Sequence, residues 1–101
     1  PVGTINSWIF VNGHLSEEAF IQAMMTATEA KAKALFDERV EDSVTGTVAT
    51  GTSTDSILIA ASQRGTMFPY AGTITEIGKA IGEAIYTCTR EAVQKTRKSV
   101  G

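Results

Sequence analysis

The stretch SEEAFIQAMMTATEAKAKALFDE, residues 16–38, predicts a long helix, and the rest of the chain is arranged around it. Ser16 suits the N-cap, and the two glutamates that follow it place negative charge in the first turn. Leu15 and Phe20 occupy the two positions of a hydrophobic staple. One face should cover a core, because it carries apolar residues at helical spacing: Phe20, Met24, Ala27, Ala34 and Leu35.

A second long helix is predicted over residues 73–98. Thr73, followed three residues later by Glu76, forms a capping box at its start. Gly78 and Gly82 lie one turn apart, so another element can pack tightly against the helix there. The helix carries a continuous apolar stripe: Ile74, Ile77, Ile81, Ala84, Ile85, Cys88 and Ala92.

Two short apolar segments, residues 5–11 and 56–61, predict buried strands. Asn12-Gly13 ends the first strand, since this pair readily adopts positive φ. Residues 67–71 predict a short strand at a sheet edge, because Pro69 has no backbone donor to offer a neighbour. The sequence therefore alternates short strands with long helices.

This order predicts an α/β fold in a single domain of residues 1–101, with two long helices packed on a small mixed sheet. So small a sheet leaves an edge or a face exposed. We therefore expect a partner, which is either a second copy of the chain in a homo-oligomer or an N-terminal portion of the protein that this chain lacks.

Composition and charge exclude several classes of function. Acidic residues outnumber basic ones by 11 to 9, so nucleic acid is not expected as a partner, because phosphate binding needs a clustered positive field. A membrane is not expected either, since no apolar run approaches the roughly 20 residues that span one. The single cysteine, Cys88, is expected in the core, and one histidine and one cysteine offer no metal site. A cytoplasmic location is expected.

The segment Thr50-Gly51-Thr52-Ser53-Thr54-Asp55 is the first candidate site. It places hydroxyl groups, a flexible backbone and a carboxylate immediately before a strand. Such a loop can bind a ligand through several hydrogen bonds, and Asp55 could orient a water or accept a proton. The alternative is an Asx or Ser/Thr turn, whose side chains bond only to their own backbone.

Two further candidates lie on the helices. Lys31, in the stretch Thr28-Glu29-Ala30-Lys31, falls near the centre of the apolar face of the first helix. Such a lysine must extend its ammonium group to water, pair with a carboxylate or lose its charge. A paired lysine could hold a binding site together, and an uncharged one could act as an acid or base. The segment Tyr70-Ala71-Gly72-Thr73 leads into the second helix, whose free N–H groups could receive an oxyanion or a carbonyl. The alternative there is an ordinary capping box.

Four stretches in this chain resemble, in their order, the adenosylcobinamide amidohydrolase family: Gly3-Thr4-Ile5-Asn6, Ala27-Thr28-Glu29-Ala30-Lys31, Ala49-Thr50-Gly51-Thr52-Ser53-Thr54-Asp55 and Tyr70-Ala71-Gly72-Thr73. The likeness covers nearly the whole chain but only the C-terminal portion of the family's usual domain. A histidine often follows the Gly-Thr of the last stretch in that family, whereas this chain has Ile74, which leaves cleavage open.

The resemblance implies a hydrolase that cleaves the amide between the corrin ring and the aminopropanol arm of adenosylcobinamide. Its products are adenosylcobyric acid and the amino alcohol, and the acid re-enters coenzyme B12 synthesis in the cytoplasm. It implies no separate cofactor, because the corrinoid enters with its cobalt as the substrate. The competing hypothesis is a binding or assembly module that holds a corrinoid without cleaving it.

Amide hydrolysis needs an activated water, donors for the tetrahedral oxyanion and an acid for the leaving amine. We assign Asp55 as the base and Lys31 as the acid or as an anchor for Asp55. Thr50, Thr52 and the Gly51 amide are assigned as donors to the oxyanion or to corrin amides. Lys31, residues 50–55 and Gly72-Thr73 are expected to converge on one pocket. The residues expected to bind substrate are Asn6, Thr28, Glu29, Thr50, Gly51, Thr54, Tyr70, Gly72 and Thr73.

Overall fold

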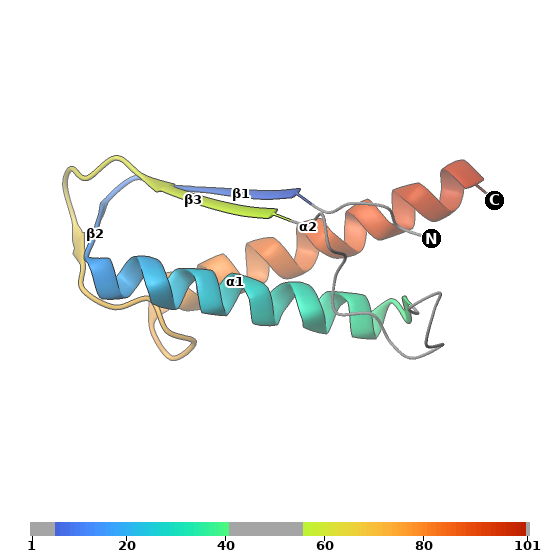
Figure 1. Cartoon of the computed structure of the whole chain (residues 1–101), viewed down its shortest axis with the longest axis horizontal. Helices are drawn as coiled ribbons and strands as arrows, with labels where there is room; N and C mark the ends of the chain where they lie inside the picture. The colour runs from blue at the N-terminus through green and yellow to red at the C-terminus, as the bar shows by residue number, and fades with distance from the viewer. Residues whose placement is uncertain (1–5, 41–55, 101) are drawn as a thin grey trace.

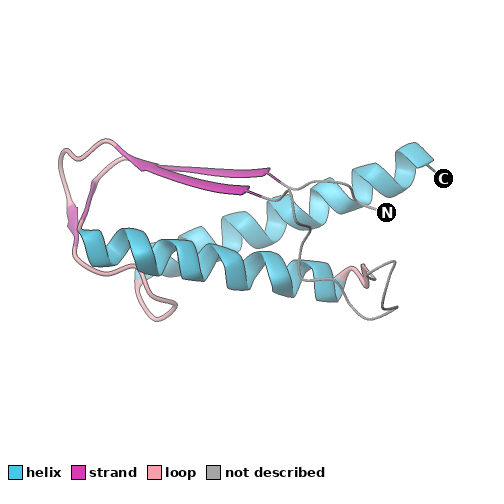
Figure 2. Cartoon of the chain, in the orientation of Figure 1, coloured by secondary structure: helices cyan, strands magenta, loops and turns pink. Residues whose placement is uncertain are grey.

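The computed structural model describes residues 6–40 and 56–100 of the chain, and only the backbone for the last four of these. Short strands and two long helices alternate along it (Figure 2). The elements are β1 (Asn6–Val11), β2 (His14–Leu15), α1 (Glu17–Asp37), β3 (Ser56–Ala61), β4 (Met67–Phe68) and α2 (Glu76–Val100). The predicted α/β fold, with two long helices on a small sheet, is confirmed.

The strands form two parallel pairs. β1 runs parallel to β3, in a register that places Asn6 opposite Ser56 and Val11 opposite Ala61. β2 pairs in parallel with β4, which is the short strand predicted beside Pro69. Because parallel strands need a long crossover, α1 lies between β1 and β3 in the chain. Figure 1 shows both helices on the same side of the β1–β3 pair.

The N-cap of α1 is the predicted Ser16. Its Oγ accepts a hydrogen bond from the Ala19 N–H at 3.0 Å and donates one to the Pro69 carbonyl at 2.6 Å. The cap therefore also ties the start of α1 to the segment that follows β4. At the other end, Arg39 adopts a φ of 56° and turns the chain out of the helix.

Alanines fill the interface of α1 with the rest of the molecule. Ala19, Ala23 and Ala27 are fully buried, and they pack in one core cluster with Ile81 and Ile85 of α2. Small side chains let the two helices approach closely. Met24 of the predicted stripe lies outside this interface with 39% exposure, because the buried face is centred on the alanines.

The start of α2 corrects the prediction of a capping box at Thr73. The capping residue is Thr75, whose Oγ1 accepts from the Gly78 N–H at 3.0 Å and donates to the Gly72 carbonyl at 2.7 Å. A turn closed by the Thr75 N–H and the same carbonyl precedes the helix. Thr73 and Ile74 lie on the outside of this turn, and Ile74 is 89% exposed.

The buried face of α2 also differs from the predicted stripe. Ile81, Ile85, Thr89 and Val93 are buried at four-residue spacing, whereas Cys88 is exposed. The expectation of a core cysteine is therefore wrong. The cause is the way α2 packs against α1. The helix face that carries Ile85 lies against α1, whereas the adjacent face that carries Cys88 is left uncovered.

Gly13 serves packing and not the expected positive φ. A Cβ at this position would lie 2.5 Å from the Phe68 ring, so only glycine lets β4 close over the β1–β2 corner. The left-handed residues in this region are instead Gln63 and Gly65, in the turn after β3. The Gln63 side chain accepts from the Leu15 N–H at 2.8 Å and donates to its carbonyl at 3.1 Å, which anchors β2.

Neither helix, within the part of the chain that the structure describes, has a stretch long and apolar enough to cross a membrane.

The two helical glycines give a matched pair of variants. A Cβ at Gly78 would overlap the Gly72 carbonyl oxygen and lie 2.8 Å from that of Ala71, so Gly78→Ala should destabilise the chain by about 3 kcal/mol. A Cβ at Gly82 would meet only the Thr26 methyl group at 3.7 Å, so Gly82→Ala should stabilise by up to about 1 kcal/mol through helix propensity. Urea denaturation measures both, and equal stability of the two variants would contradict the tight contact at Gly78.

Candidate functional site

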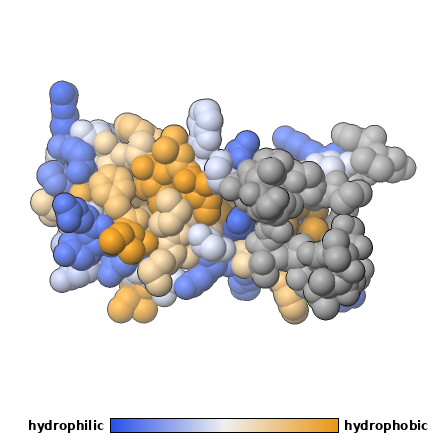
Figure 3. Space-filling view, in the orientation of Figure 1, coloured by the Kyte–Doolittle hydropathy of each residue, from blue (hydrophilic) through white to orange (hydrophobic). Residues whose placement is uncertain are grey.

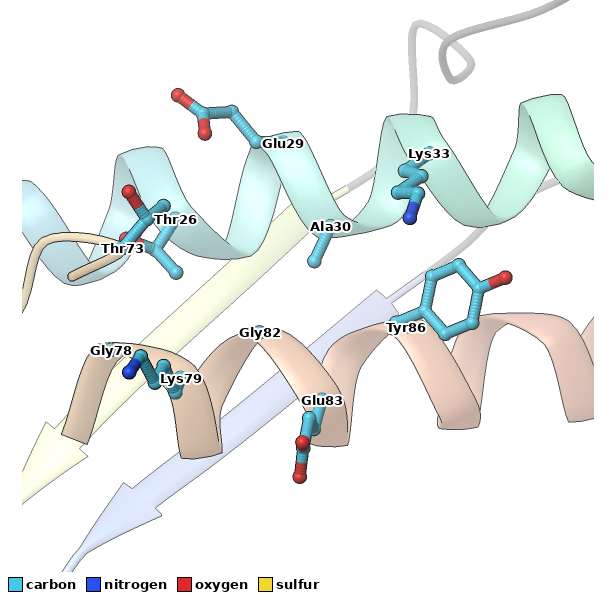
Figure 4. A pocket seen from close by; sticks show the side chains of 10 residues that line it. All are labelled: Thr26, Glu29, Ala30, Lys33, Thr73, Gly78, Lys79, Gly82, Glu83 and Tyr86. Carbon is cyan, nitrogen blue, oxygen red and sulfur yellow. The ribbon is translucent and has the colours of Figure 1, made fainter. Parts of the chain in front are cut away.

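An open groove of about 390 Å³ runs between α1 and α2. We call it the helix groove. Its floor has little side-chain bulk, because Ala30 lies on α1 and Gly78 and Gly82 on α2 (Figure 4). Thr26 and Thr73 line one end, and Tyr86 lines the other. Gly82 leaves the groove open at its centre, because a Cβ there would meet only the Thr26 methyl group at 3.7 Å.

Four charged side chains surround this uncharged floor. Glu29 and Lys33 come from α1, and Lys79 and Glu83 come from α2. Figure 4 shows the Glu29 and Glu83 carboxylates pointing away from the floor, and Lys33 directed toward the Tyr86 ring. With two charges of each sign, the rim suits neutral polar groups such as amides, which both donate and accept hydrogen bonds.

The threonine end of the groove is fixed by the loop before α2. Thr26 is 4% exposed, and its hydroxyl donates to the Ala71 carbonyl at 3.1 Å. The Ala71 N–H in turn donates to the Gln22 side chain at 2.8 Å. Both backbone groups of Ala71 are thus held by α1, and this positions Thr73 two residues later at the mouth of the groove.

The tyrosine end is held by charged partners. The Tyr86 hydroxyl donates to Asp37 and accepts from the Arg90 guanidinium at 3.2 Å. The Lys33 Nζ lies 5.5 Å from the centre of the tyrosine ring, within cation–π range. The hydrogen bond to Asp37, followed by desolvation, raises the pKa of Tyr86 above its ordinary value. The phenol proton is thus held in the hydrogen bond to Asp37, which links the two helices at this end of the groove.

A second contact continues this link between the helices. Arg90 Nε donates to Glu38 at 2.8 Å, and the Gln94 side chain donates to the same carboxylate oxygen at 3.0 Å. The hydrogen bond to Glu38 raises the pKa of Arg90, so its charge is permanent. Beside them, Leu35 and Val93 form a small apolar cluster. These contacts hold the far half of the helix pair together, and they serve structure.

The helix groove brings together two of the predicted binding residues, Glu29 and Thr73. Lys31 is not among its lining residues and lies buried on the inner side of α1, at 9% exposure. Thr28 is exposed, and its hydroxyl donates to the Met24 carbonyl of its own helix at 2.8 Å. That bond satisfies Thr28 locally, which is the ordinary role of a helical threonine.

The other predicted residues are spread around the sheet. Asn6 accepts from the Ser56 hydroxyl at 2.8 Å, at the amino ends of β1 and β3. Tyr70 is 59% exposed before the turn, and the Gly72 carbonyl closes that turn. Thr50, Gly51, Thr52, Thr54 and Asp55 lie outside the described residues. Their expected convergence with Lys31 and Gly72-Thr73 therefore stays a prediction.

Comparisons with known proteins place these residues in a family. The sequence profile of the adenosylcobinamide amidohydrolases matches residues 1–101. The chain belongs to this family. An adenosylcobinamide amidohydrolase of Methanosarcina mazei is 38% identical over 92 residues, which cover 82% of this chain and 42% of that protein. An uncharacterized protein of Methanocaldococcus jannaschii is 32% identical over 98 residues, covering 96% of this chain and 38% of that protein.

The chain thus spans less than half the length of these relatives. No solved structure matches it.

Five lining residues of the groove were missed by the sequence analysis: Thr26, Lys33, Lys79, Glu83 and Tyr86. A signal for them exists, because Gly78, Gly82 and Tyr86 recur at four-residue spacing and so share one helix face. Glycines on a face that also carries polar residues mark a groove rather than a core. Among the described residues, no cluster of histidine, cysteine or carboxylate side chains could hold a metal ion.

The Tyr86–Asp37 bond predicts a measurable titration. In a Tyr70→Phe background, which leaves Tyr86 as the only tyrosine, the phenol should ionise above pH 10. Asp37→Ala should lower this pKa, since it removes the hydrogen bond that raises the pKa most and keeps the Arg90 contacts that lower it. Because the folded-state pKa is raised, the bond stabilises the fold fully below the unfolded pKa and is lost as pH rises through the folded one.

Absorbance near 295 nm, followed against pH, gives both pKa values. Glu29→Ala is the control, because that carboxylate points away from the tyrosine. An unchanged Tyr86 pKa in Asp37→Ala would contradict the hydrogen bond as its cause.

Proposed function

We propose that this chain forms part of an amidohydrolase that cleaves the corrin–aminopropanol amide of adenosylcobinamide. The products are adenosylcobyric acid and the amino alcohol, and the reaction serves cobamide salvage in the cytoplasm. One observation carries the proposal: the family profile matches the whole chain, including every stretch assigned to the site. No cofactor is required, since the corrinoid brings its own cobalt.

The helix groove supports binding of such a substrate. The edge of a corrin ring carries neutral amides, and these fit a rim that offers both carboxylates and ammonium groups. Glu29 can accept from an amide N–H, and Lys79 can donate to an amide carbonyl. Ala30 and Gly82, which have little or no side chain, allow a flat apolar surface to approach the backbone of the helices.

For the hydrolytic step we propose Asp55 as the base that activates water. Asp55 immediately precedes Ser56, where β3 begins, and β3 packs on α1. Figure 1 shows the start of β3 above the second half of α1, the half that contains Lys31. This supports Lys31 as the acid for the leaving amine or as the anchor of Asp55. Thr50, Thr52 and the Gly51 amide are then the donors to the tetrahedral oxyanion.

A second candidate function is a corrinoid carrier that binds without cleaving. Ile74 favours it, because the family often has a histidine at this position and Ile74 is almost fully exposed beside Thr73. An isoleucine can neither accept nor donate a proton. The two functions differ in their products and are separated by one experiment.

The experiment incubates adenosylcobinamide with the purified chain, alone and mixed with the part of the Methanosarcina mazei relative outside the match. We expect adenosylcobyric acid, identified by chromatography with mass detection. Asp55→Asn should slow its formation by about 100-fold or more, since a general base contributes that much. Thr96→Ala is the matched control, and its rate should be unchanged because its exposed hydroxyl donates to the Ala92 carbonyl of its own helix, away from every residue assigned to the site.

Two outcomes would contradict hydrolysis. Equal rates for Asp55→Asn and the unaltered chain would exclude the proposed base. A change in the corrinoid spectrum without any adenosylcobyric acid, in either mixture, would support the carrier instead.

A further inference from the structure

The outer face of the β1–β3 pair is apolar. Trp8 is 79% exposed, Phe10 is 71% exposed, and Leu58 of β3 is 55% exposed. The strand register places Trp8 directly opposite Leu58, so the three side chains form one patch. Figure 3 shows hydrophobic residues gathered over the part of the molecule where the strands lie.

This patch is unusual for a parallel pair. Parallel strands occur almost only in sheets whose two faces are both covered, and their sequences are accordingly apolar throughout. Here Ile9 and Ile57 pack against the core on the helix side, whereas nothing among the described residues covers Trp8 and Phe10 on the other side. The sequence of β1 is thus that of an internal strand, while its surroundings are those of a surface strand.

The second feature is a groove of about 440 Å³ along β1. Within the described residues, β1 pairs on one edge with β3 and on its other edge with no strand. The groove beside it is lined by Ser7 and Ile9 of β1 and by Ala84, Cys88 and Ala92 of α2. Small side chains at four-residue spacing on α2 leave room for an extended strand, which would pair with β1 and cover this stripe.

We infer that the outer patch and the groove along β1 form one docking surface for the part of the family chain that lies outside the match. That part would add a strand to β1, over α2, and an apolar helix across Trp8, Phe10 and Leu58. The inference rests on the family relationship and on the two surfaces, and it does not require hydrolysis.

The length of the relatives favours this occupant. More than half of each of the two curated relatives lies outside the match, which is enough chain for several strands and helices. A second copy of this chain fits less well. Pairing β1 with the β1 of a copy would fill the edge, but it would leave Trp8 and Phe10 bare on the face of the joined sheet.

The partner surface should therefore be apolar and not strongly charged. Its strand should present small or β-branched residues to Ala84 and Cys88, and its helix should present aliphatic residues to the patch. Trp8 reports on docking, because it is the only tryptophan of the chain.

The test labels the chain with 5-fluorotryptophan and adds the part of the Methanosarcina mazei relative outside the match, produced as a separate polypeptide. We expect a one-to-one complex by light scattering and a shifted ¹⁹F resonance of Trp8 that no longer responds to the D₂O content of the solvent. Phe10→Arg and Leu58→Arg should each weaken binding at least tenfold. Ile21→Arg is the matched control, since Ile21 is 64% exposed on α1, away from this surface, and should bind as the unaltered chain does.

Three outcomes would overturn the inference. The first is a Trp8 resonance that does not change when the polypeptide is added. The second is binding of the polypeptide that Phe10→Arg and Leu58→Arg do not weaken. The third is a homodimer of the chain that dissociates when Phe10 is changed to Arg. The matched segment of the Methanosarcina mazei protein itself, mixed with the same polypeptide, is the positive control. Because no readout uses a corrinoid, failure of docking and failure of hydrolysis are separate results.

Discussion

The close approach of α1 and α2 is the constraint that shapes this chain. Alanines on α1 let the two helices approach closely, and Gly78 leaves room for the Gly72 and Ala71 carbonyls to pack against the start of α2. The helix groove is what remains above those small residues. The same packing sets the rotation of α2, which buries Ile85 against α1 and leaves Cys88 on the side of β1. Fold, groove and open sheet edge therefore share one cause.

The sheet has a covered side and a bare side. Both helices lie against the same face of β1 and β3, and the opposite face carries Trp8 and Phe10 into solvent. The inferred docking of the rest of the family chain would cover the bare side. The chain has the features of one layer of a larger α/β domain.

Much of the fold follows from local sequence. Ser16 caps α1 as its spacing predicts, and the apolar run at residues 56–61 is a strand. The start of α2 was placed at Thr73 because threonine and glutamate stand three residues apart. The true cap is Thr75, because Thr73 lies within the turn that the Gly72 carbonyl closes. The position of this turn depends on the contact between Gly72 and Gly78, which the local sequence pattern does not reveal.

The candidate site was less predictable. Glu29 and Thr73 were found because they belong to family stretches, whereas Tyr86 was missed. Tyr86 acquires its role from Asp37, 49 residues earlier, and no local pattern reports a contact of that range. Cys88 was misplaced for the same reason: a helix with apolar residues on adjacent stripes has two possible inner faces, and only its docking against α1 selects one.

Hydrogen exchange along β1 is the measurement that separates a complete small domain from one layer of a larger sheet. Alternate amides of a strand point to opposite edges, so β1 carries one set toward β3 and one set away from it. In the chain alone, the outward set should exchange nearly as fast as unfolded peptide, and the set facing β3 should exchange slowly. Adding the remaining part of the Methanosarcina mazei relative should slow the outward set by about 100-fold or more. Outward amides that are already protected in the chain alone, or that stay unprotected in the mixture, would contradict a sheet completed by that part of the family chain.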